Sequence, residues 1–504
     1  MSTSHTLPRP ALPGRTPRLP ERVHFLGAGG AGVSGATLLL HAAGHRVSAS
    51  DRADSEHTRM LRQAGIDVKV GEEESRLPED VGLVVRSAAV PESDARVREA
   101  LERGVPVLKY SELLGRITPA GRTLAVAGTH GKTTTSWMLH HALRGLLEAR
   151  LGDVAARARH PDAPLPGELP APGALIGGLC RELGVNAVQP APGGWFAVEA
   201  CEYDRSFLQL APAGAVITNV EADHLDYFGD LDTIKGAFAR FADRVHPNGL
   251  LVVGQELPRR VEEGARCPVW RLERDLKVQL TSERAGCFSF RLRGPEFSLE
   301  EVHLAVPGRF NVDNAALALA LVVGLAAREW CLDPDEAARA AARGLERFRG
   351  SQRRFEPWGE VDGVSVVHDY AHHPTEVRAT IEAARRALAG RPLHVLFQPH
   401  QHSRTARFLG EFVESLRGAD RVVVADVYGA RAHIDGGHLA GAPELVANLA
   451  RAGVAAEAGG DLAASVRIFA RGLPERCAAL VLGAGDVDGI REELTRAVAV
   501  RGAP

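Results

Sequence analysis

A glycine-rich turn follows an apolar run in the stretch Leu124-Ala-Val-Ala-Gly-Thr-His-Gly-Lys-Thr-Thr-Thr135. The apolar run predicts a strand, and the residues after the turn predict a helix. Backbone N–H groups at such a helix start can cradle phosphates, the Lys132 ammonium can neutralise their charge, and a threonine hydroxyl can coordinate Mg²⁺. Val126 stands where the longer G-x-x-x-x-G-K-S/T loop has its first glycine. The stretch therefore predicts a shorter phosphate loop for ATP and Mg²⁺, with a turn that binds no ligand as the alternative.

Short β-branched runs recur on both sides of this loop, and most of them precede a helix-like segment. The predicted strands are residues 23–26, 46–50, 83–86, 124–127, 196–198, 215–218, 250–253, 365–367, 394–397, 422–425 and 479–482. This alternation is typical of α/β folds, in which helices cover both faces of parallel sheets. We therefore predict an α/β protein, with a P-loop ATPase-like parallel sheet around the phosphate loop.

The chain of 504 residues is too long for one hydrophobic core. A typical domain of about 150 residues suggests about three domains. The strand–helix pattern restarts after glycine- or proline-marked joints near residues 118–121 and 349–351. We expect a disordered lead-in at residues 1–21, followed by three α/β domains at residues 22–120, 121–347 and 348–504. Within the second domain, residues 148–173 are expected to form a surface insertion.

Composition narrows the class of protein. The formal net charge of −3 indicates no affinity for nucleic acid or for an anionic membrane surface. The six cysteines are scattered without a C-x-x-C pair, which suits a reducing compartment. The proline-rich first twenty residues lack the apolar core of a signal peptide, and the apolar run 315–327 is too short to span a bilayer. We expect a soluble cytoplasmic protein with a buried helix over that run; the sequence is silent on oligomeric state.

A second glycine-rich turn, Gly27-Ala-Gly-Gly-Ala-Gly32, follows the first predicted strand. It matches G-x-G-x-x-G, in which glycines allow a tight turn and a close approach to a diphosphate. Asp51 ends the next predicted strand, nineteen residues after Gly32, where an acidic residue would bind a ribose. The pattern predicts a Rossmann-like first domain with a nucleotide diphosphate site at Gly27, Gly29, Gly30, Gly32 and Asp51. It fits NAD and a UDP-linked ligand equally well, and tight packing without a ligand is the alternative.

Two further strand ends carry possible metal ligands. Glu199 ends the predicted strand at 196–198, and His224 follows the strand at 215–218 within a group of acidic residues. Open α/β sheets bind ligands at these carboxyl ends. Because Mg²⁺ prefers carboxylates, phosphate oxygens and water, Glu199 is a candidate ligand. His224 is a less usual ligand for Mg²⁺, and the alternative is that it has a structural role.

Taken together, these motifs resemble the Mur ligase family. The resemblance extends from about residue 22 to about residue 435 and rests on residues 24–35, 128–135, 198–208, 218–226, 307–314, 353–355, 368–376 and 398–400, in the family's order. It implies a UDP-sugar-binding first domain, a central ATPase domain and a Rossmann-like third domain that receives the amino acid. The implied reaction is cytoplasmic and belongs to peptidoglycan precursor synthesis. ATP phosphorylates the carboxylate of UDP-N-acetylmuramate, and L-alanine displaces phosphate from the acyl phosphate.

The resemblance also implies roles for single residues. ATP would be bound by Gly128, Thr129, His130, Gly131, Lys132, Thr133, Thr134, Asn314, Arg354 and Asp369. Asn314 would contact the adenine, and Arg354 and Asp369 would reach the nucleotide from the third domain. The metal would be held by Thr133, Glu199 and His224. Lys132, His372 and Arg404 would be catalytic, with His372 near the reacting centre and Arg404 facing the alanine carboxylate. Surface arginines and a capped turn are the structural alternatives for Arg354, Arg404 and His372.

Three departures from the family concern the metal site and the amino-acid site. Gln401 stands where the alanine-adding members usually have arginine, so half of a carboxylate clamp is missing. The run 427–431 differs from the usual Tyr-Pro-Ala, and Lys235 cannot be assigned as the carbamylated lysine of several members. The choice of amino acid is therefore more open than the type of reaction.

Other functions remain as alternatives. A ligase that adds a recycled peptide to the same UDP-sugar shares all three domains, whereas folate-type polyglutamate ligases resemble only the second and third. A nicotinamide-dependent oxidoreductase would leave the phosphate loop and Glu199 without a purpose. A non-catalytic nucleotide-binding protein would bind ATP without turnover. Because Lys132 and Arg354 lie in different predicted domains but are assigned to one nucleotide, we also expect the domains to close on substrate.

Overall fold

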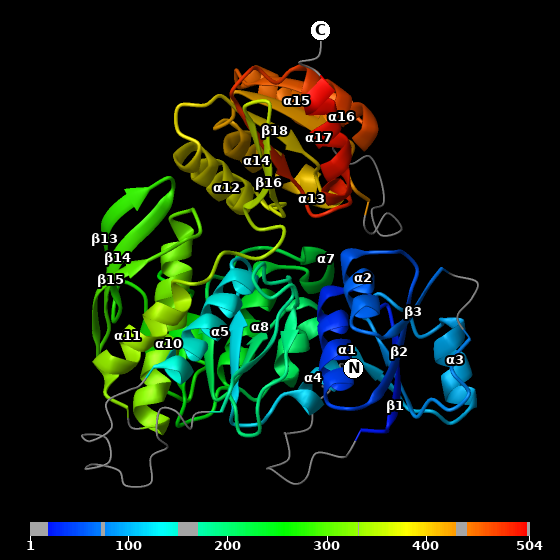
Figure 1. Cartoon of the computed structure of the whole chain (residues 1–504), viewed down its shortest axis with the longest axis vertical. Coiled ribbons are helices and arrows are strands. Elements are labelled where there is room, and N and C mark those ends of the chain that lie inside the picture. The colour runs from blue at the N-terminus through cyan, green and yellow to red at the C-terminus, as the bar shows by residue number, and fades with distance from the viewer. Residues whose placement is uncertain (1–18, 72–75, 150–169, 331, 430–440, 501–504) are drawn as a thin grey trace.

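The computed structural model describes residues 19–71, 76–149, 170–330, 332–429 and 441–500. Most of the predicted lead-in and of the predicted 148–173 insertion lies outside these ranges. The described residues form four sheets, three of them mainly parallel. In Figure 1 the first unit (blue) lies beside the central one (cyan to green), and the C-terminal unit (yellow to red) lies above both. The predicted α/β class with three units is confirmed.

The first unit is a five-stranded parallel sheet in the order β3-β2-β1-β4-β5, as in a Rossmann-like fold. Its glycine turn joins β1 to α1, because β1 is buried and the chain must reverse at once into the covering helix. The elements are β1 (Arg22–Leu26), α1 (Ala31–Ala42), β2 (Arg46–Asp51), α2 (Glu56–Gln63), β3 (Asp67–Val70), β4 (Leu83–Arg86), α3 (Ala95–Glu102), β5 (Val107–Lys109) and α4 (Tyr110–Ile117).

The central unit is a seven-stranded sheet in the order β12-β11-β10-β6-β9-β7-β8, with the fully buried β6 in its middle. The phosphate loop joins β6 to α5, so it opens at the carboxyl edge of the sheet. The elements are β6 (Thr123–Ala127), α5 (Lys132–Glu148), β7 (Gly173–Leu175), β8 (Ala187–Val188), β9 (Phe196–Glu199), η2 (Tyr203–Gln209), β10 (Gly214–Ile217), α7 (Leu225–Phe228), α8 (Leu231–Ala242), β11 (Leu250–Val253), α9 (Arg259–Glu262) and β12 (Val269–Arg271).

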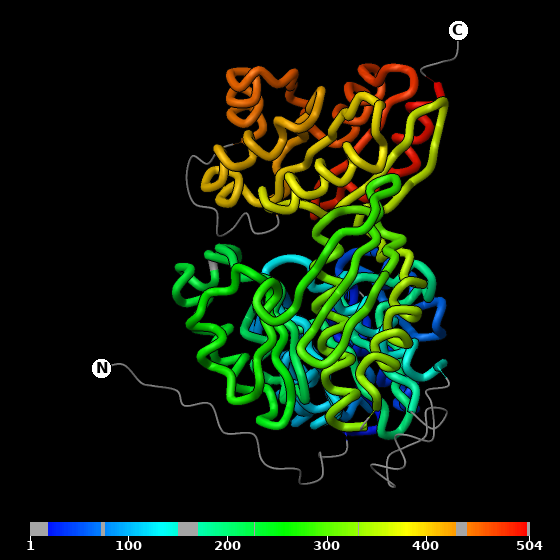
Figure 2. Tube along the Cα trace, turned by 90° about the vertical axis from the view of Figure 1, so that its left-hand side faces the viewer, coloured from blue at the N-terminus to red at the C-terminus, as the bar shows by residue number. Residues whose placement is uncertain are grey.

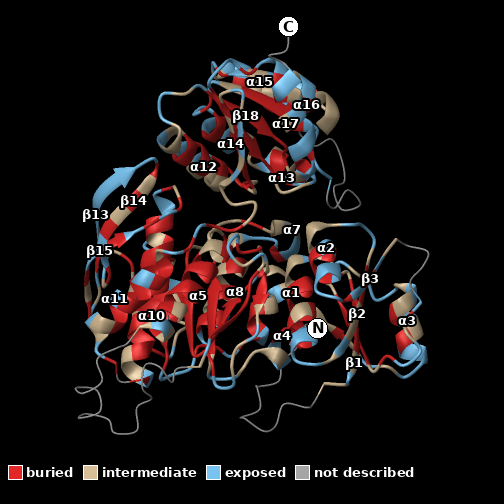
Figure 3. Ribbon diagram, in the orientation of Figure 1, coloured by how far each residue is buried: buried red, intermediate tan, exposed pale blue. Residues whose placement is uncertain are grey.

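Helices α10 (Phe310–Glu329) and α11 (Pro334–Leu345) complete this unit. Helix α10 has the length and apolar character of a membrane span, but 83% of its apolar window is buried inside the protein. Figure 3 shows it as a largely buried helix among α5 and α11. The predicted buried helix is confirmed, and it extends on both sides of the apolar run that predicted it.

An antiparallel sheet of β13 (Lys277–Arg284), β14 (Cys287–Arg293) and β15 (Ser298–His303) was not predicted. Its sequence signal is the alternation of buried Phe288, Phe290 and Leu292 with more exposed residues along β14. Figure 2 shows this hairpin rising towards the C-terminal unit. There Glu283 of β13 pairs with Arg386 at 2.8 Å.

The C-terminal unit has a six-stranded sheet in the order β16-β17-β21-β18-β19-β20, in which β16 is antiparallel to β17. The elements are β16 (Glu356–Val361), β17 (Val364–Asp369), α12 (Pro374–Ala387), β18 (Leu393–Phe397), α13 (His402–Arg407), α14 (Leu409–Leu416), β19 (Arg421–Ala425), α15 (Ala442–Arg451), β20 (Ala455–Gly460), α16 (Leu462–Arg471), β21 (Ala478–Leu482), η3 (Val487–Ile490) and α17 (Arg491–Val500).

Every predicted strand falls on a strand of these sheets, and those missed are mainly short or edge strands and the antiparallel sheet. We propose domain boundaries near residues 120 and 348. They lie between α4 and β6, and between α11 and β16, where the chain passes from one sheet to the next.

Helices α5 and α11 cross at two glycines that carry no side chain between them. A Cβ on Gly344 would collide with the His141 carbonyl and lie 2.6 Å from the Gly145 nitrogen. Because these neighbours are backbone atoms, Gly344→Ala is expected to lower the free energy of unfolding by about 1–3 kcal/mol. Denaturant unfolding measures this. The control is Gly236→Ala in α8, where the nearest atom is 3.8 Å away. It should stabilise the protein by about 0.5–1 kcal/mol, and equal effects of the two variants would contradict the packing argument.

Candidate active site

The phosphate loop is held open by residues that follow β10. Gly128 and Gly131 adopt φ angles of 140° and 82°, which favour glycine. Asn219 accepts the His130 N–H through its side-chain oxygen at 2.8 Å, and Thr218 donates to the His130 carbonyl at 2.6 Å. The residues that follow β10 therefore fix the conformation of the phosphate loop before any phosphate binds.

Lys132 lies at the centre of this loop. Its Nζ donates to the carbonyls of Gly128 at 2.5 Å and Thr129 at 2.9 Å, and it pairs with the Glu202 carboxylate at 3.0 Å. Although burial disfavours the ammonium, Glu202 outweighs it and raises the pKa of Lys132 above its usual value. The cation is thus fully charged and oriented over the loop. Glu202 is a partner that the sequence analysis did not assign.

Two of the three predicted metal ligands are in direct contact. The Thr133 hydroxyl donates to Glu199 at 3.0 Å, and the Gly177 N–H donates to the same oxygen at 2.8 Å. His224 immediately precedes α7 in the loop after β10, which lies on the other side of β6 from β9, and its ring is 5.2 Å from that of Tyr203. A hydroxyl beside a carboxylate at a phosphate loop suits Mg²⁺, which takes few protein oxygens and completes its shell with phosphate and water.

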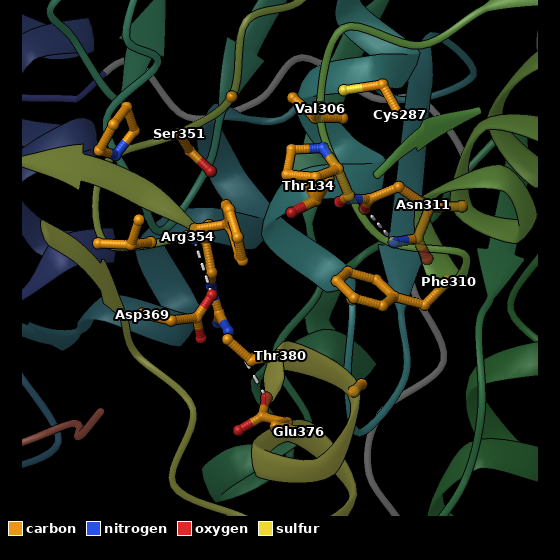
Figure 4. A pocket seen from close by; sticks show the side chains of 18 of the residues that line it. Thr134, Cys287, Val306, Phe310, Asn311, Ser351, Arg354, Asp369, Glu376 and Thr380 are labelled. Atoms are coloured by element: carbon orange, nitrogen blue, oxygen red, sulfur yellow. Dashed lines mark hydrogen bonds and ion pairs between the residues drawn. The ribbon is translucent and has the colours of Figure 1, made fainter. Parts of the chain in front are cut away.

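A cavity of about 540 Å³ opens between the central and C-terminal units. Six residues predicted to bind ATP line it: His130, Gly131, Thr134, Asn314, Arg354 and Asp369. Figure 4 shows Thr134 and Asn311 facing Arg354 and Asp369 across this space, with Phe310 and Val306 at its apolar side. Its wall joins polar and apolar groups, as a nucleotide requires. The structure therefore brings together residues from both units that were predicted to share one nucleotide.

Asp369 ends β17 at the floor of the cavity. Its two oxygens accept the N–H groups of Phe355 at 2.7 Å and Ala371 at 2.8 Å. Burial raises the pKa of this carboxyl to about 6, against the opposing effect of Arg354. Arg354 in turn lies over the Tyr370 ring, 5.2 Å from its centroid.

Glu376 connects the two units. It lies 3.2 Å from His130 of the phosphate loop, 3.5 Å from Arg354 and 3.3 Å from His372. Burial disfavours the His130 cation, but Glu376 and Glu221 outweigh it and raise the pKa of His130 to about 9. For His372, burial prevails and lowers the pKa to about 4. One carboxylate thus faces a protonated ring from one unit and a neutral ring from the other.

A second group of contacts crosses the same interface. Buried Arg404 donates to buried Asp223, and its other terminal nitrogen lies 3.2 Å from His400. Although burial favours the acid form, nearby His224 and Arg404 hold the pKa of Asp223 well below its usual range. Arg404, Gln401 and His224 line a further cavity of about 540 Å³. The predicted amino-acid residues therefore lie beside a predicted metal ligand.

The glycine turn of the first unit borders a cavity of about 600 Å³, which Gly27, Gly30 and Asp51 line. Gly29 lies behind Asp51 and donates its N–H to that carboxylate at 2.7 Å. Gly32 faces Tyr110, and a Cβ there would lie 2.7 Å from the ring. Three of the five predicted residues therefore line the cavity, while Gly29 and Gly32 have packing roles.

Several residues of the site received no role from the sequence, among them Glu202, Glu221, Asp223, Thr375 and Glu376. Thr375 donates to Glu221 at 2.8 Å across the interface. Glu376 lies within the family motif at residues 368–376, in the first turn of α12, but that motif did not assign it a role. Pairing between units leaves no local pattern in the sequence.

The pKa of His130 predicts that closure of the two units depends on pH. Glu376 of the C-terminal unit contributes part of the rise in the pKa of His130 from 6.5 to about 9, so its stabilising effect on closure is present at low pH and is lost as the pH rises through about 9. We expect the radius of gyration from solution scattering to increase over that interval. In His130→Gln the increase should be absent, and an identical pH profile in that variant would refute the assignment.

Comparison with known proteins agrees with this geometry. Three family models match in order: "Mur ligase family, catalytic domain" over residues 22–122, "Mur ligase middle domain" over 193–322 and "Mur ligase, glutamate ligase domain" over 353–485. A UDP-N-acetylmuramate–L-alanine ligase from Rubrobacter xylanophilus is 40% identical over 418 residues, which are 81% of this chain and 85% of that protein. The chain belongs to the Mur ligase family.

Other Mur ligases match over nearly the full length. The protein of the same name from Kineococcus radiotolerans is 40% identical over 95% of this chain and 97% of its own. The crystal structure of a UDP-N-acetylmuramate–alanine ligase from Thermotoga maritima has a TM-score of 0.74 at 24% identity, covering 94% of this chain and 98% of that one. A murein peptide ligase from Psychrobacter arcticus has a TM-score of 0.67 at 22% identity, covering 95% and 98%. These two structures share the Mur ligase fold.

Proposed function

We propose that this Mur ligase joins L-alanine to the carboxylate of UDP-N-acetylmuramate in peptidoglycan precursor synthesis, with conversion of ATP to ADP and phosphate. The proposal rests on the relatives of that name at 40% identity. The observation that carries the chemistry is the contact of Thr133 with Glu199 beside the half-buried Lys132. ATP and UDP-sugars are cytoplasmic metabolites, so we propose the cytoplasm as the site of action.

The first step requires charge neutralisation between two anions. A carboxylate is a poor acyl donor, and transfer of the γ-phosphoryl group to it supplies a leaving group. Lys132 and the N–H groups of the loop would bind the phosphates, and Arg354 would approach from the C-terminal unit. Mg²⁺ would be held by Thr133 and Glu199, with His224 as the proposed third ligand, and supplies positive charge to the phosphates when bound.

The second step forms the amide. The amine of L-alanine attacks the acyl carbon, the C–N bond forms, and the C–O bond to phosphate breaks. Arg404 and Gln401 would bind the alanine carboxylate in the cavity that they line with His224. His372 is neutral because burial lowers its pKa to about 4, so its ring is in the form that accepts a proton from the attacking amine.

Phosphate release from ATP tests the proposal. Purified protein with Mg²⁺ and UDP-N-acetylmuramate should release phosphate when L-alanine is added, and Lys132→Ala should not. Preference for L-serine or glycine would retain the proposed ligase reaction and would attribute the different amino-acid preference to Gln401. Turnover only with a tripeptide would replace L-alanine by a recycled peptide, and ATP binding without turnover with any acceptor would contradict the proposal.

A further inference from the structure

A cluster of side chains that could bind a metal lies outside the active site, at the second half of helix α5, whereas the phosphate loop lies at the start of that helix. His141 faces the loop after β7, where Cys180 and Glu182 lie. The Cys180 thiol donates to Glu182 at 3.0 Å, and His141 Nε2 lies 4.0 Å from the other carboxylate oxygen. The three ligand atoms all lie within 4.8 Å of one another. His141 and Cys180 are buried, whereas the Glu182 side chain is 25% exposed, so solvent reaches the cluster from one side.

The hydrogen bonds of His141 decide where its proton lies. Its Nδ1 is 2.9 Å from the Trp137 carbonyl oxygen, which can only accept, so Nδ1 carries the proton. With the proton on Nδ1, the neutral ring has a lone pair on Nε2. This lone pair faces the Glu182 carboxylate. Two electron-rich groups and a sulfur thus converge in a buried place, an arrangement that a cation between them would stabilise.

The nearby arginines pair with a residue outside this cluster. Arg144 and Arg347 are two positively charged groups near His141, and both pair with Glu148 at the end of α5. A metal ligand histidine commonly donates its second ring N–H to a carbonyl, as His141 does to Trp137. The cluster therefore has both the ligands and the orienting contact of a metal site.

We propose that His141, Cys180 and Glu182 bind Zn²⁺, with water as the fourth ligand. Thiolate, imidazole and carboxylate are the ligands that Zn²⁺ accepts in tetrahedral sites, whereas Mg²⁺ avoids sulfur. Ligand atoms at the usual zinc distances are about 3.5 Å apart, so the side chains need to move inward by about 1 Å. On binding, the Cys180 thiol loses its proton to solvent and the Zn–S bond forms, with no change in oxidation state.

The zinc site would fasten the hinge between the central and C-terminal units. The loop that carries Cys180 and Glu182 pairs with the linker at residues 349–352. Arg181 N–H donates to Gly350 at 3.1 Å, and Gln352 N–H donates to Leu179 at 2.9 Å. Glu182 also accepts the Arg349 N–H. Zinc would thus tie this linker to α5, the helix whose first residue is Lys132.

Cobalt absorption tests the site without any assay of ligase activity. The metal-free full chain is titrated with Co²⁺ in excess Mg²⁺, which occupies the phosphate site. We expect a thiolate-to-cobalt charge-transfer band at one Co²⁺ per chain, removed by one equivalent of Zn²⁺. Cys180→Ser should abolish the band, and His141→Gln should weaken binding by more than about 100-fold. The control Cys267→Ser, at a buried thiol in another cluster, should retain it.

The outcomes separate the proposal from its alternatives. No thiolate band in the parent protein, or a band that persists in Cys180→Ser, would overturn the site. Trypsin provides the test of the hinge, because Arg347 and Arg349 flank it. Zinc should slow cleavage there in the parent and in Cys267→Ser but not in His141→Gln. Equal cleavage rates with and without zinc would contradict the proposal that zinc stabilises this hinge.

Discussion

Lys132→Ala is expected to lower the rate of alanine-dependent phosphate release by at least about 1,000-fold. The ammonium is fully charged and is held inside the phosphate loop by Glu202 and by the carbonyls of Gly128 and Thr129, so its positive charge lies beside the place where the loop would bind phosphates. Removing it takes away charge neutralisation in the transition state. Single-turnover phosphate release measures the effect, and a loss of less than about tenfold would contradict the assignment of the loop.

Stability has to be separated from chemistry in this variant. Lys132→Ala leaves Glu202 buried without its cation, which is expected to cost about 3–5 kcal/mol. The double variant Lys132→Ala, Glu202→Gln removes that unpaired charge and should recover most of the stability. Its activity should remain lost. If activity returned together with stability, Lys132 would have a structural role only.

Local signals predicted the parts of the site that depend on one turn or one strand end. The phosphate loop follows from a buried strand, two glycines and the start of a helix. The contact of Thr133 with Glu199 joins residues 66 positions apart, but Glu199 ends β9 and Thr133 follows the loop at the carboxyl end of the neighbouring parallel strand β6. Topology alone therefore brings them together, and this is why the sequence sufficed.

Contacts that depend on how units pack could not be predicted in the same way. Glu376 meets His130 only because α12 lies against the phosphate loop, and no period or motif encodes that approach. The role of Gly32 likewise depends on the Tyr110 ring that faces it. The antiparallel sheet was missed because its strands are mostly exposed on one side and carry many charges, which weakens the apolar signal.

The interface also explains how two histidines that contact the same carboxylate have different protonation states. His372 and His130 share Glu376, yet the first is neutral and the second is protonated. His130 has a second carboxylate, Glu221, whereas His372 lies near the Arg404 cation. Closure of the units thus sets the protonation of both rings, which links the geometry of the hinge to the proton transfer proposed for His372.

Arg404→Met is expected to raise the KM for L-alanine by at least about 100-fold and to destabilise the closed arrangement by about 3–5 kcal/mol. The second effect arises because the buried Asp223 carboxylate loses its arginine partner. Arg385→Met is the matched control. Its pair with Asp420 is exposed, so the change should be below about 1 kcal/mol without an effect on KM.

The double variant Asp223→Asn, Arg404→Met separates binding of alanine from closure. Without the unpaired carboxylate, the closed arrangement should recover, as measured by scattering with substrates bound. The KM for L-alanine should stay high, because the guanidinium that would bind the alanine carboxylate is still missing. Recovery of both quantities would mean that Arg404 acts only through Asp223. In that case Arg407, Ser403, Gln401 and His224, which also line this cavity, would be the candidates for alanine recognition.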